Sequence, residues 1–386
     1  MRIAYICADA GIPVFGCKGA SVHVQEMLRA FLRKGAEIVL FARRIGTPPA
    51  DLRTIPVVQL DPLPAGDAQI RSAAALAANP QLESALKAEG PFDLVYERYS
   101  LWSFAGITYA CQRGWCTVLE VNAPLIEEQR KYRKLVAEEA AVKVLQNLLA
   151  SAAAVIAVSP GVKRYLSGFT SSPERIHIIA NGVDPRRFAS ASAHPQVHAD
   201  TTVIGFLGTL KPWHGLEHLL TAFALLQAQR PQTSLLIIGD GPERKLLQDE
   251  AMRLGLNNVV FTGAVSPIRV AEWLARTDIA VAPYPRLEQF YFSPLKIYEY
   301  MAAALPVVTT RVGHLANVVA DGHTGMLAAP DDPEALCEAL LTLVDDPVMR
   351  QRLGKNARRY VMHNHSWDSV AEEILRIVDL SNGSMP

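Results

Sequence analysis

The stretch that decides the fold is residues 203–228, VIGFLGTLKPWHGLEHLLTAFALLQA. It opens with Val203–Gly208, a short apolar run whose length is typical of a buried strand. A loop that ends on Gly215 leads into Leu216–Ala228, where apolar residues recur at helical spacing. A strand, a loop and a helix in this order begin a βαβ unit, so the stretch predicts a parallel sheet.

The same alternation of strands and helices runs through both halves of the chain. Ser190–Thr202, small and polar with one proline, interrupts it and is typical of a linker. The sequence therefore predicts two α/β domains, residues 1–195 and 196–365, followed by a capped amphipathic helix, Ser366–Leu380. The strands expected besides Val203–Gly208 are Ile3–Asp9, Glu37–Ala42, Leu94–Tyr99, Thr117–Asn122, Val155–Ser159, Ile176–Asn181, Leu235–Gly239, Val259–Thr262, Ile279–Pro283 and Pro306–Thr310.

Composition excludes several classes of protein. Half of the 386 residues are apolar and 20% are charged, which suits packed cores and excludes a disordered chain. The 38 basic residues balance the 38 acidic ones, so bulk charge gives no support for a nucleic-acid partner. Five cysteines without a Cys-x-x-Cys pair favour reduced thiols over a zinc site. The N-terminus lacks the order of a signal peptide, and no apolar run approaches the roughly 20 residues of a spanning helix, so we expect a cytoplasmic protein.

In an open parallel sheet, ligands bind beyond the carboxyl ends of the strands, so the segments after the strands are the candidate sites. Lys211 and His214 stand just ahead of a helix start, and a cation beside free amides suits a phosphate. Ser293 can cap a helix on which Lys296 and Glu299 face roughly the same way. A carboxylate there can accept two vicinal sugar hydroxyls while Lys296 holds phosphate. The alternative is an exposed Lys–Glu pair on a core helix.

The first half offers weaker candidates. The glycine-containing loop Gly16–Ser21 opens a helix whose amides can hold an anion, but the absence of Gly-x-Gly-x-x-Gly argues against a classical dinucleotide site. The charge run Glu127–Lys134 favours a solvated helix face; the alternatives are contact with an acidic acceptor or with a membrane surface. Four polar residues at strand ends are candidates for acceptor or sugar contact and are equally typical of structural roles: Glu97, Arg98, Glu120 and Asn122.

Taken in order and spacing, these motifs resemble those of GT-B glycosyltransferases of the family 4 type (glycosyltransferase group 1), a retaining group that uses activated sugar donors. The resemblance covers essentially the whole chain. The matching segments are the Gly16–Gly19 loop with His23, Asn181-Gly182-Val183-Asp184, Phe206–Gly215, Gly239–Glu243, Ser293-Pro294-Leu295-Lys296 with Glu299-Tyr300-Met301-Ala302, and Asp321–Gly325.

The resemblance implies two Rossmann-like domains that face each other across a cleft, with residues 366–386 crossing back to the N-terminal domain. The C-terminal domain would bind the nucleotide sugar, and the N-terminal domain the acceptor. The catalytic residues implied are Lys211, His214, Lys296 and Glu299. Donor contacts are expected from Gly16, Thr209, Gly239, Val265, Glu288, Tyr291, Ser293, Pro294 and Leu295. Acceptor contacts are expected from Lys18, His23, Glu97, Arg98, Glu120 and Asn122.

Two departures from the family pattern affect the donor site. The family's Arg and Lys for the diphosphate match Thr209 and His214, so Lys211 or a protonated His214 is expected to replace the charge. Of the family's two glutamates, eight residues apart, Glu299 matches the second. Tyr291 stands at the first position, and Glu288 is close enough in sequence to reach in from the loop.

The resemblance further implies transfer with retention and no cofactor beyond the UDP- or GDP-linked sugar, and the chain contains no Asp-x-Asp that would suggest a metal. The acceptor is a glycan, a lipid or a small molecule, and a lipid acceptor would bring the protein to the inner face of the membrane. Two alternatives stay open. One is a catalytically silent GT-B subunit that binds a partner enzyme, and the other is a GT-B nucleotide-sugar 2-epimerase, although those enzymes lack the Asn-Gly-Val-Asp and Glu-Tyr-Met-Ala pair.

Overall fold

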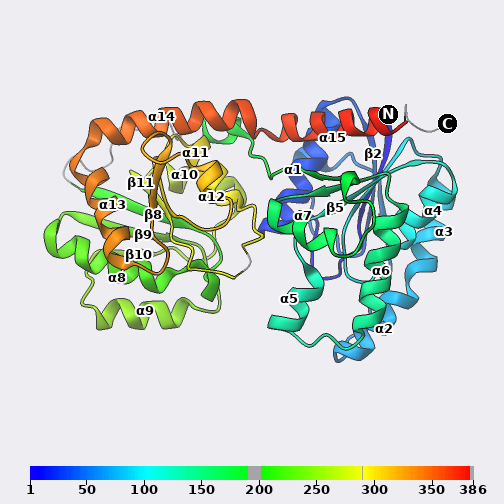
Figure 1. Ribbon diagram of the computed structural model, residues 1–386, viewed down its shortest axis with the longest axis horizontal. Helices are drawn as coiled ribbons and strands as arrows, with labels where there is room; N and C mark the ends of the chain where they lie inside the picture. Colours follow the sequence, from blue (N-terminus) through cyan, green and yellow to red (C-terminus); the bar gives the residue numbers. More distant parts are fainter. Residues whose placement is uncertain (190–200, 289, 383–386) are drawn as a thin grey trace. The chain divides into compact units, whose positions relative to one another are not determined.

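A computed structural model describes residues 1–189, 201–288 and 290–382 (Figure 1). The chain divides into two compact units. The N-terminal unit comprises Met1–Asn181, Tyr291–Ser293 and the described residues from Trp367 to Asn382, and the C-terminal unit comprises the described residues of Gly182–Phe290 and Pro294–Ser366. The predicted domain boundary at residue 195 falls outside the described residues.

The N-terminal unit is built on a seven-stranded parallel sheet in the order β3-β2-β1-β4-β5-β6-β7. Nearly every residue of β1, β4 and β5 is buried, as expected for strands covered by helices on both faces. The strands are β1 (Arg2–Cys7), β2 (Glu37–Ala42), β3 (Val57–Gln59), β4 (Leu94–Arg98), β5 (Cys116–Val121), β6 (Ala154–Ala157) and β7 (Ile176–Ile178).

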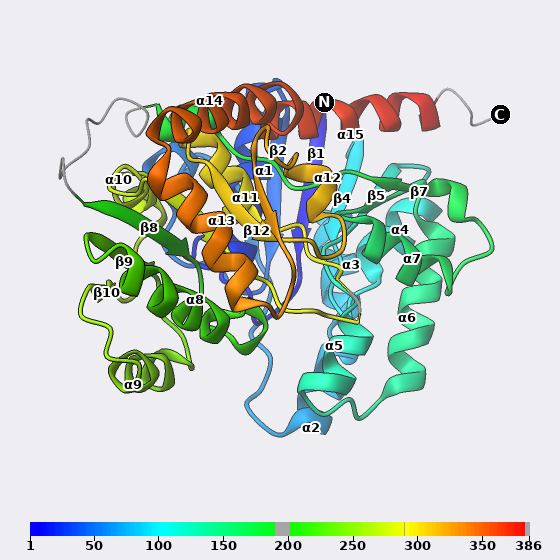
Figure 2. The ribbon, with the colours of Figure 1, turned by 60° about the vertical axis from the view of Figure 1, so that its left-hand side comes forward.

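Helices cover both faces of this sheet, and α1 and α15 pack against each other (Figure 2). Because α15 also packs on β5 and β6, the C-terminal helix completes the N-terminal unit. The helices are α1 (Gly19–Arg33), α2 (Ala68–Ala77), α3 (Asn79–Glu89), α4 (Ala105–Gln112), α5 (Leu125–Tyr132), α6 (Glu138–Ser151), α7 (Pro160–Ser167) and α15 (Trp367–Asn382).

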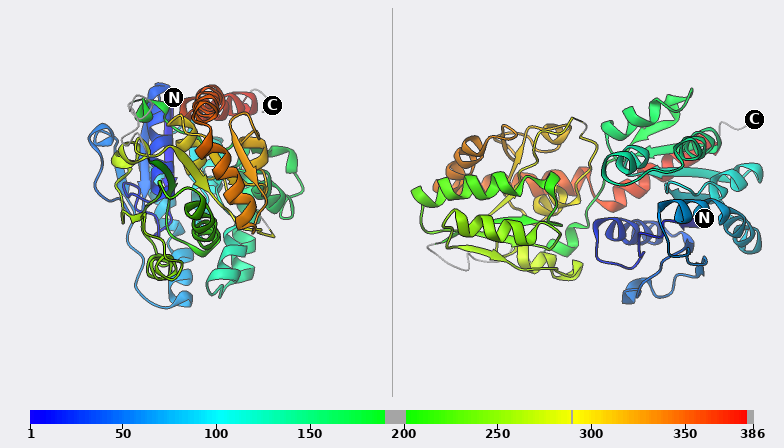
Figure 3. Two further views of the ribbon diagram at one scale, coloured as in Figure 1. Left: turned by 90° about the vertical axis from the view of Figure 1, so that its left-hand side faces the viewer. Right: turned by 90° about the horizontal axis from the view of Figure 1, so that it is seen from below.

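The C-terminal unit has a six-stranded parallel sheet in the order β10-β9-β8-β11-β12-β13. Its strands are β8 (Thr202–Leu207), β9 (Thr233–Ile238), β10 (Val259–Phe261), β11 (Ile279–Ala282), β12 (Val307–Thr310) and β13 (Gly325–Ala328). Its helices are α8 (Leu216–Gln229), α9 (Arg244–Arg253), α10 (Val270–Leu274), α11 (Leu295–Ala302), α12 (Leu315–Val318), α13 (Pro333–Asp345) and α14 (Pro347–Asn364). Figure 1 and Figure 3 show α8 and α9 on one side of the sheet, with α10, α11 and α14 on the other.

The strand–loop–helix interpretation of residues 203–228 is confirmed by β8 and α8, and the parallel sheets it predicts are present in both units. Sequence reasoning missed β3 and β13. Both are short, three and four residues, and they carry too few apolar residues to stand out from loops. They form because a neighbouring strand, β2 or β12, presents an open edge for pairing.

Gly354 of α14 sets how closely this helix approaches the end of α11. A Cβ atom at Gly354 would lie 1.9 Å from the carbonyl oxygen of Ala304, the second residue after α11. Backbone cannot move aside as a flexible side chain can, so only glycine permits this contact. The two helices pack together along this contact, so α14 helps to hold α11 in place.

We expect Gly354→Ala to lower the free energy of unfolding by about 1–3 kcal/mol, the usual cost of forcing an extra carbon into a packed interior. The readout is the midpoint of urea unfolding, measured beside Arg352→Ala, which changes an exposed residue of the same helix. A midpoint for Gly354→Ala equal to that of Arg352→Ala would contradict the packing described for α11 and α14.

Candidate functional site

The residues predicted for the second half come together at the carboxyl edge of the sheet in the C-terminal unit. Thr209, Lys211 and His214 follow β8, Gly239 follows β9, Val265 follows β10, and the exposed Glu288 lies in the loop after β11. Helix α11 begins at the same edge and carries Leu295, Lys296 and Glu299. The topology therefore gathers at one edge residues that are up to ninety positions apart in sequence.

Helix α11 is fixed to this edge by Tyr300. The Tyr300 hydroxyl accepts a hydrogen bond from the amide of Leu207 at 2.7 Å and donates one to the carbonyl of Val281 at 3.2 Å. One buried side chain thus joins the ends of β8 and β11 to the helix. Lys296 lies four residues before Tyr300 and so projects from the same face of α11 toward the end of β8.

The Lys296 ammonium is the most unusual group of this edge. Lys296 is 8% exposed, and its Nζ atom has no hydrogen-bond partner among the described residues. Nζ lies 4.2 Å from the centre of the Phe206 ring and 5.5 Å from that of Tyr284, so its contacts are cation–π contacts. Burial lowers the pKa of Lys296 to about 7, although the charge of Glu299 opposes the shift. A buried cation held this way needs an anion to complete its coordination.

The backbone beside Lys296 is built from glycine. Gly208 has a φ of 149°, and a Cβ atom there would lie 2.7 Å from Lys296 Nζ. Gly239 has a φ of 138°, and its Cβ would lie 2.0 Å from the Gly208 carbonyl oxygen. The peptides after β8 and β9 therefore approach each other and the ammonium without side chains between them, which leaves backbone accessible to a ligand.

Of the two alternatives for the missing cation, Lys211 and a protonated His214, the second is disfavoured by the surroundings of His214. Its Nδ1 lies 2.6 Å from the carbonyl oxygen of Thr209, which can only accept, so Nδ1 bears the proton. Burial together with the charges of Lys296 and Lys211 lowers the pKa of His214 to about 2. The protonated form predicted to replace the missing cation is thus disfavoured. A neutral His214 offers its Nε2 lone pair to a ligand hydroxyl instead.

The segment 291–293 departs from the sequence expectation, because it clusters with the N-terminal unit. The Tyr291 hydroxyl donates to Glu128 at 2.5 Å, and the Tyr291 carbonyl accepts from Ser159 at 2.6 Å. Ser293 was expected to cap α11, but its hydroxyl accepts from the amide of Asn181, and the cap residue of α11 is Pro294, with no side-chain cap. The first amides of α11 are therefore left without a capping side chain.

In the N-terminal unit, Glu120 is the centre of a buried polar network. One carboxylate oxygen accepts from His23 Nε2 at 2.6 Å and from the Tyr96 hydroxyl at 2.7 Å, and the other lies 3.4 Å from the Arg98 guanidinium. The register of β4 and β5 pairs Arg98 directly with Glu120. Burial alone would raise the pKa of Glu120, but these partners outweigh it and lower the pKa to about 2. The His23 ring also packs edge-on against Trp367 of α15.

Glu97 points the other way, because successive side chains of a strand alternate between faces. Its carboxylate is fully buried and accepts from the Ser103 hydroxyl at 2.6 Å and the Ile107 amide at 3.0 Å. Burial raises its pKa to about 7 against these two hydrogen bonds. These contacts correct the expectation that Glu97 faces an acceptor, since its polar atoms serve the packing of α4.

The remaining candidates of the N-terminal unit lie at the carboxyl edge of its sheet. Lys18 is exposed at the start of α1, beside the half-buried Gly16. Asn122 follows β5, and its amide nitrogen is buried without a hydrogen-bond partner among the described residues. Arg98, at the end of β4, is 8% exposed. Lys18, Arg98 and Asn122 remain candidates for acceptor contact, whereas His23 and Glu120 are occupied by each other.

Sequence reasoning missed the aromatic residues that surround Lys296. Phe206 is the last but one residue of β8 and Tyr284 lies in the loop after β11, and an aromatic residue at either position does not by itself indicate chemistry. Tyr300 could have been predicted from the sequence, because a tyrosine four residues after a functional lysine lies on the same face of the helix. Among the described residues, no three His, Cys, Asp or Glu side chains gather as a metal site would require. No helix in these ranges is long and apolar enough to cross a membrane.

Two family models match the chain. Residues 18–187 match Glycosyltransferase Family 4, and residues 192–360 match Glycosyl transferases group 1. Among curated proteins, the chain is 28% identical over 305 residues to the MMP alpha-(1->4)-mannosyltransferase of Mycolicibacterium hassiacum, covering 75% of this chain and 71% of that protein. It is 26% identical over 406 residues to the D-inositol 3-phosphate glycosyltransferase of Acidothermus cellulolyticus, covering 96% of this chain and 86% of that protein.

Solved structures show the same fold. Sucrose-phosphate synthase from Thermosynechococcus elongatus superposes with a TM-score of 0.76 at 23% identity, covering all of both chains. Anabaena HepE in complex with UDP and glucose gives a TM-score of 0.73 at 20% identity, covering 98% of this chain and 99% of that one. The fold and the family models together define a GT-B glycosyltransferase. The chain belongs to the family 4, group 1 type of these enzymes, as the motifs indicated.

The two buried glutamates on neighbouring strands give a matched test. Folding lowers the pKa of Glu120 from 4.5 to about 2, so its charge stabilises the fold above about pH 4.5, and this contribution is lost as pH falls toward 2. We expect Glu120→Gln to lower the free energy of unfolding by about 3 kcal/mol at neutral pH and by progressively less below pH 4.5.

The ionisation of Glu97 has the opposite effect on the stability of the fold. Folding raises its pKa to about 7, so its ionisation opposes folding increasingly between pH 4.5 and 7 and fully above that range. Glu97→Gln should therefore be at least as stable as the wild type at about pH 8. Urea unfolding of both variants across this pH range checks the pair. Equal destabilisation by the two substitutions at pH 8 would refute the description of the two carboxylates.

Proposed function

We propose that this enzyme transfers a sugar, with retention, from a nucleotide-sugar donor bound at the carboxyl edge of the C-terminal sheet. One observation carries the proposal: the Lys296 ammonium is buried, lacks a hydrogen-bond partner among the described residues, and lies beside the bare backbone of Gly208. A diphosphate supplies the oxygens that this cation lacks. The uncapped start of α11 adds amide donors to the same anion.

UDP is the favoured donor nucleotide. Structures of Anabaena HepE, a fold neighbour, contain UDP or UDP-glucose, and a trehalose-6-phosphate structure from E. coli contains UDP-2-fluoro glucose. A GDP-linked sugar stays the alternative. Glu299, one turn after Lys296 on α11, is proposed to accept the vicinal ribose hydroxyls. The transferred sugar is a hexose in this proposal.

The chemistry needs a stabilised leaving group. The bond from the anomeric carbon to the phosphate oxygen breaks, and the acceptor hydroxyl oxygen bonds the same carbon from the same face. The hydroxyl proton passes to the departing phosphate oxygen. Lys296 and the α11 amides stabilise the negative charge that develops on the diphosphate. Such preorganised groups each lower the activation free energy by a few kcal/mol. Lys211 adds a more distant cation, while the neutral His214 is suited to a sugar hydroxyl. We propose that no metal takes part.

The acceptor is proposed to bind the N-terminal unit through Lys18, Arg98 and Asn122. Helix α5 and the residues after it add exposed positive charge, because Lys131, Arg133 and Lys134 follow a segment whose Arg130 is paired with Glu138. The exposed Tyr132 ring lies in the same run, 5.5 Å from the Lys131 Nζ. An aromatic ring among cations suits an anionic membrane surface, so a lipid-linked acceptor at the inner face of a membrane is part of the proposal.

We expect Lys296→Ala to lower kcat by roughly 10²–10³ in a transfer or donor-hydrolysis assay in excess EDTA, as for loss of one preorganised stabilising group. Glu299→Ala should raise the Kd of UDP in calorimetry while leaving the fold intact. The control is Lys245→Ala, which removes an exposed lysine of α9 paired with Asp249. Wild-type turnover in Lys296→Ala would refute the site, and activity that requires added metal would refute metal independence.

A silent subunit would behave differently in the same assay. It would bind UDP through Lys296 yet neither transfer nor hydrolyse any nucleotide sugar offered. A 2-epimerase would convert UDP-GlcNAc without an acceptor. Either result with the wild-type protein would replace the transferase proposal.

UDP binding should also depend on pH through Lys296. With a pKa of about 7, the free amine is largely neutral at pH 8, and the diphosphate favours the ammonium, so binding takes up a proton. The affinity for UDP should fall by up to about tenfold per pH unit above pH 7. Calorimetry at pH 8 in two buffers of different ionisation enthalpy measures the uptake. The effect should disappear in Lys296→Ala; uptake unchanged in that variant would place the titrating group elsewhere.

A further inference from the structure

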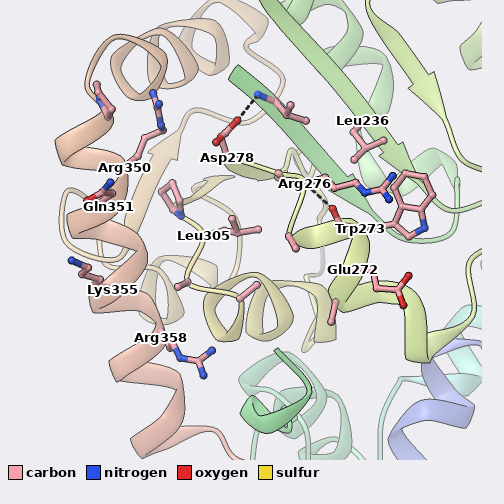
Figure 4. Close-up of a pocket in the computed structure, with 18 of the residues that line it drawn as sticks. Leu236, Glu272, Trp273, Arg276, Asp278, Leu305, Arg350, Gln351, Lys355 and Arg358 are labelled. Carbon is pink, nitrogen blue, oxygen red and sulfur yellow. Dashed lines mark hydrogen bonds between the residues drawn. The ribbon is translucent and has the colours of Figure 1, made fainter. Parts of the chain in front are cut away.

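A cavity of the C-terminal unit lies at the edge of its sheet opposite the donor site, at the amino ends of the strands. Its volume is about 1360 Å³, enough for a ligand of drug size. Residues at or just before the starts of β8, β9, β11 and β12 line it together with α10 and α14. Figure 4 shows Arg350, Gln351, Lys355 and Arg358 along α14, with Arg276 and Trp273 on the other side of the cavity. This edge plays no part in the proposed donor site.

The lining is strongly positive. The charged residues that line it are Arg276, Arg350, Lys355, Arg358 and Arg359 against Glu272 and Asp278. Asp278 accepts the amide of Val203 at 2.8 Å and also interacts electrostatically with Arg350, while Glu272 pairs with Arg269, which is not among the lining residues. In the described parts of the chain, none of the five lining cations makes an ion pair within 4.0 Å. The described residues therefore leave the lining of this cavity with a net positive charge.

Two of the arginines are held rigidly by neutral groups. Arg350, 8% exposed, donates to the carbonyls of Leu343 at 2.6 Å and Val344 at 2.9 Å. Arg358 donates to the carbonyl of Ala302, the last residue of α11. Carbonyl oxygens orient a guanidinium but carry no net charge. Burial lowers the pKa of Arg358, as expected for a desolvated cation without a counter-charge.

The other three cations are available to a ligand. Lys355 and Arg359 are exposed and lie four residues apart, on one face of α14. The Arg276 guanidinium lies 4.8 Å from the centre of the Trp273 ring, which orients it, and its N–H donors have no hydrogen-bond partner in the described parts of the chain. Guanidinium groups match phosphate oxygens in pairs, and several of them around one cavity suit more than one phosphate. Leu236, Leu305 and Trp273 give the same cavity apolar walls.

We propose that this cavity is a binding site for a small ligand that carries two or more phosphate groups, distinct from the donor site. Phosphates meet Arg276, Lys355 and Arg359, with Arg350 and Arg358 as fixed positive charge behind them. The organic part of the ligand lies against the apolar walls. A solvated cationic surface without a ligand is the competing interpretation, and saturable binding that depends on these particular cations separates the two.

The test uses the full chain saturated with UDP, so that the donor site is filled, and inorganic triphosphate as the probe. We expect saturable binding in calorimetry and a loss of affinity of at least tenfold in Lys355→Ala/Arg359→Ala. The matched control, Lys245→Ala/Arg352→Ala, also removes two positive charges, both from exposed residues outside the cavity. The control should bind triphosphate like the wild type, and all three proteins should bind UDP alike.

Absence of triphosphate binding at millimolar concentration would overturn the proposal, as would equal weakening in both double variants, which indicates charge alone. A phosphate of a lipid headgroup is the other source of this chemistry. Co-sedimentation with phosphatidylglycerol vesicles tests it, and we expect the cavity variant to sediment like the wild type. Vesicle binding that is lost only in the cavity variant would overturn the proposal of a small ligand and indicate that the cavity binds a lipid headgroup. UDP binding through Lys296 is measured separately, so the donor-site proposal stands or fails independently.

Discussion

The interaction on which the C-terminal unit depends is the contact of the Lys296 ammonium with the Phe206 ring, in a place where no described residue accepts a hydrogen bond from it. A buried cation of this kind opposes folding unless something else compensates, and aromatic faces do so only in part. The surrounding elements are arranged to keep it there. Tyr300 ties α11 to two strand ends, and Gly208 lets the backbone reach the ammonium without a side chain between them.

The position of α11 also depends on its packing against α14. Gly354 lets α14 pack closely on the chain just after α11, and Arg358 of α14 holds the carbonyl of Ala302. The helix that presents Lys296 at the carboxyl edge is thus supported by the helix that lines the cationic cavity at the amino edge. The two edges of one sheet differ in character: the carboxyl edge offers one desolvated cation and bare backbone, and the amino edge offers several cations around a cavity of about 1360 Å³.

The N-terminal unit compensates a buried charge differently, with hydrogen-bond donors and cations around a carboxylate. Glu120 is surrounded by donors from α1 and from the neighbouring strand β4, so its charge is retained, whereas Glu97 on the other face has only two neutral donors and prefers the protonated form. Strand alternation puts these two glutamates on opposite faces although their strands are adjacent. The Glu120 network joins α1 to the sheet, and the contact of His23 with Trp367 joins it to the C-terminal helix.

The sequence by itself determined the parallel α/β architecture, the family, and the edge at which the donor residues gather, because apolar periodicity and strand-end motifs are local properties of the chain. It also pointed to Lys296 and Glu299 through their spacing on one helix. Tertiary structure alone decided the charge states and several partners. His214 is neutral because Lys296 and Lys211, distant or adjacent in sequence, meet it in a desolvated place. Ser293 and Tyr291 belong to the N-terminal unit because Asn181 and Glu128 bind them. Such effects depend on which groups surround a side chain in space, and that is set by long-range packing, which no local pattern encodes.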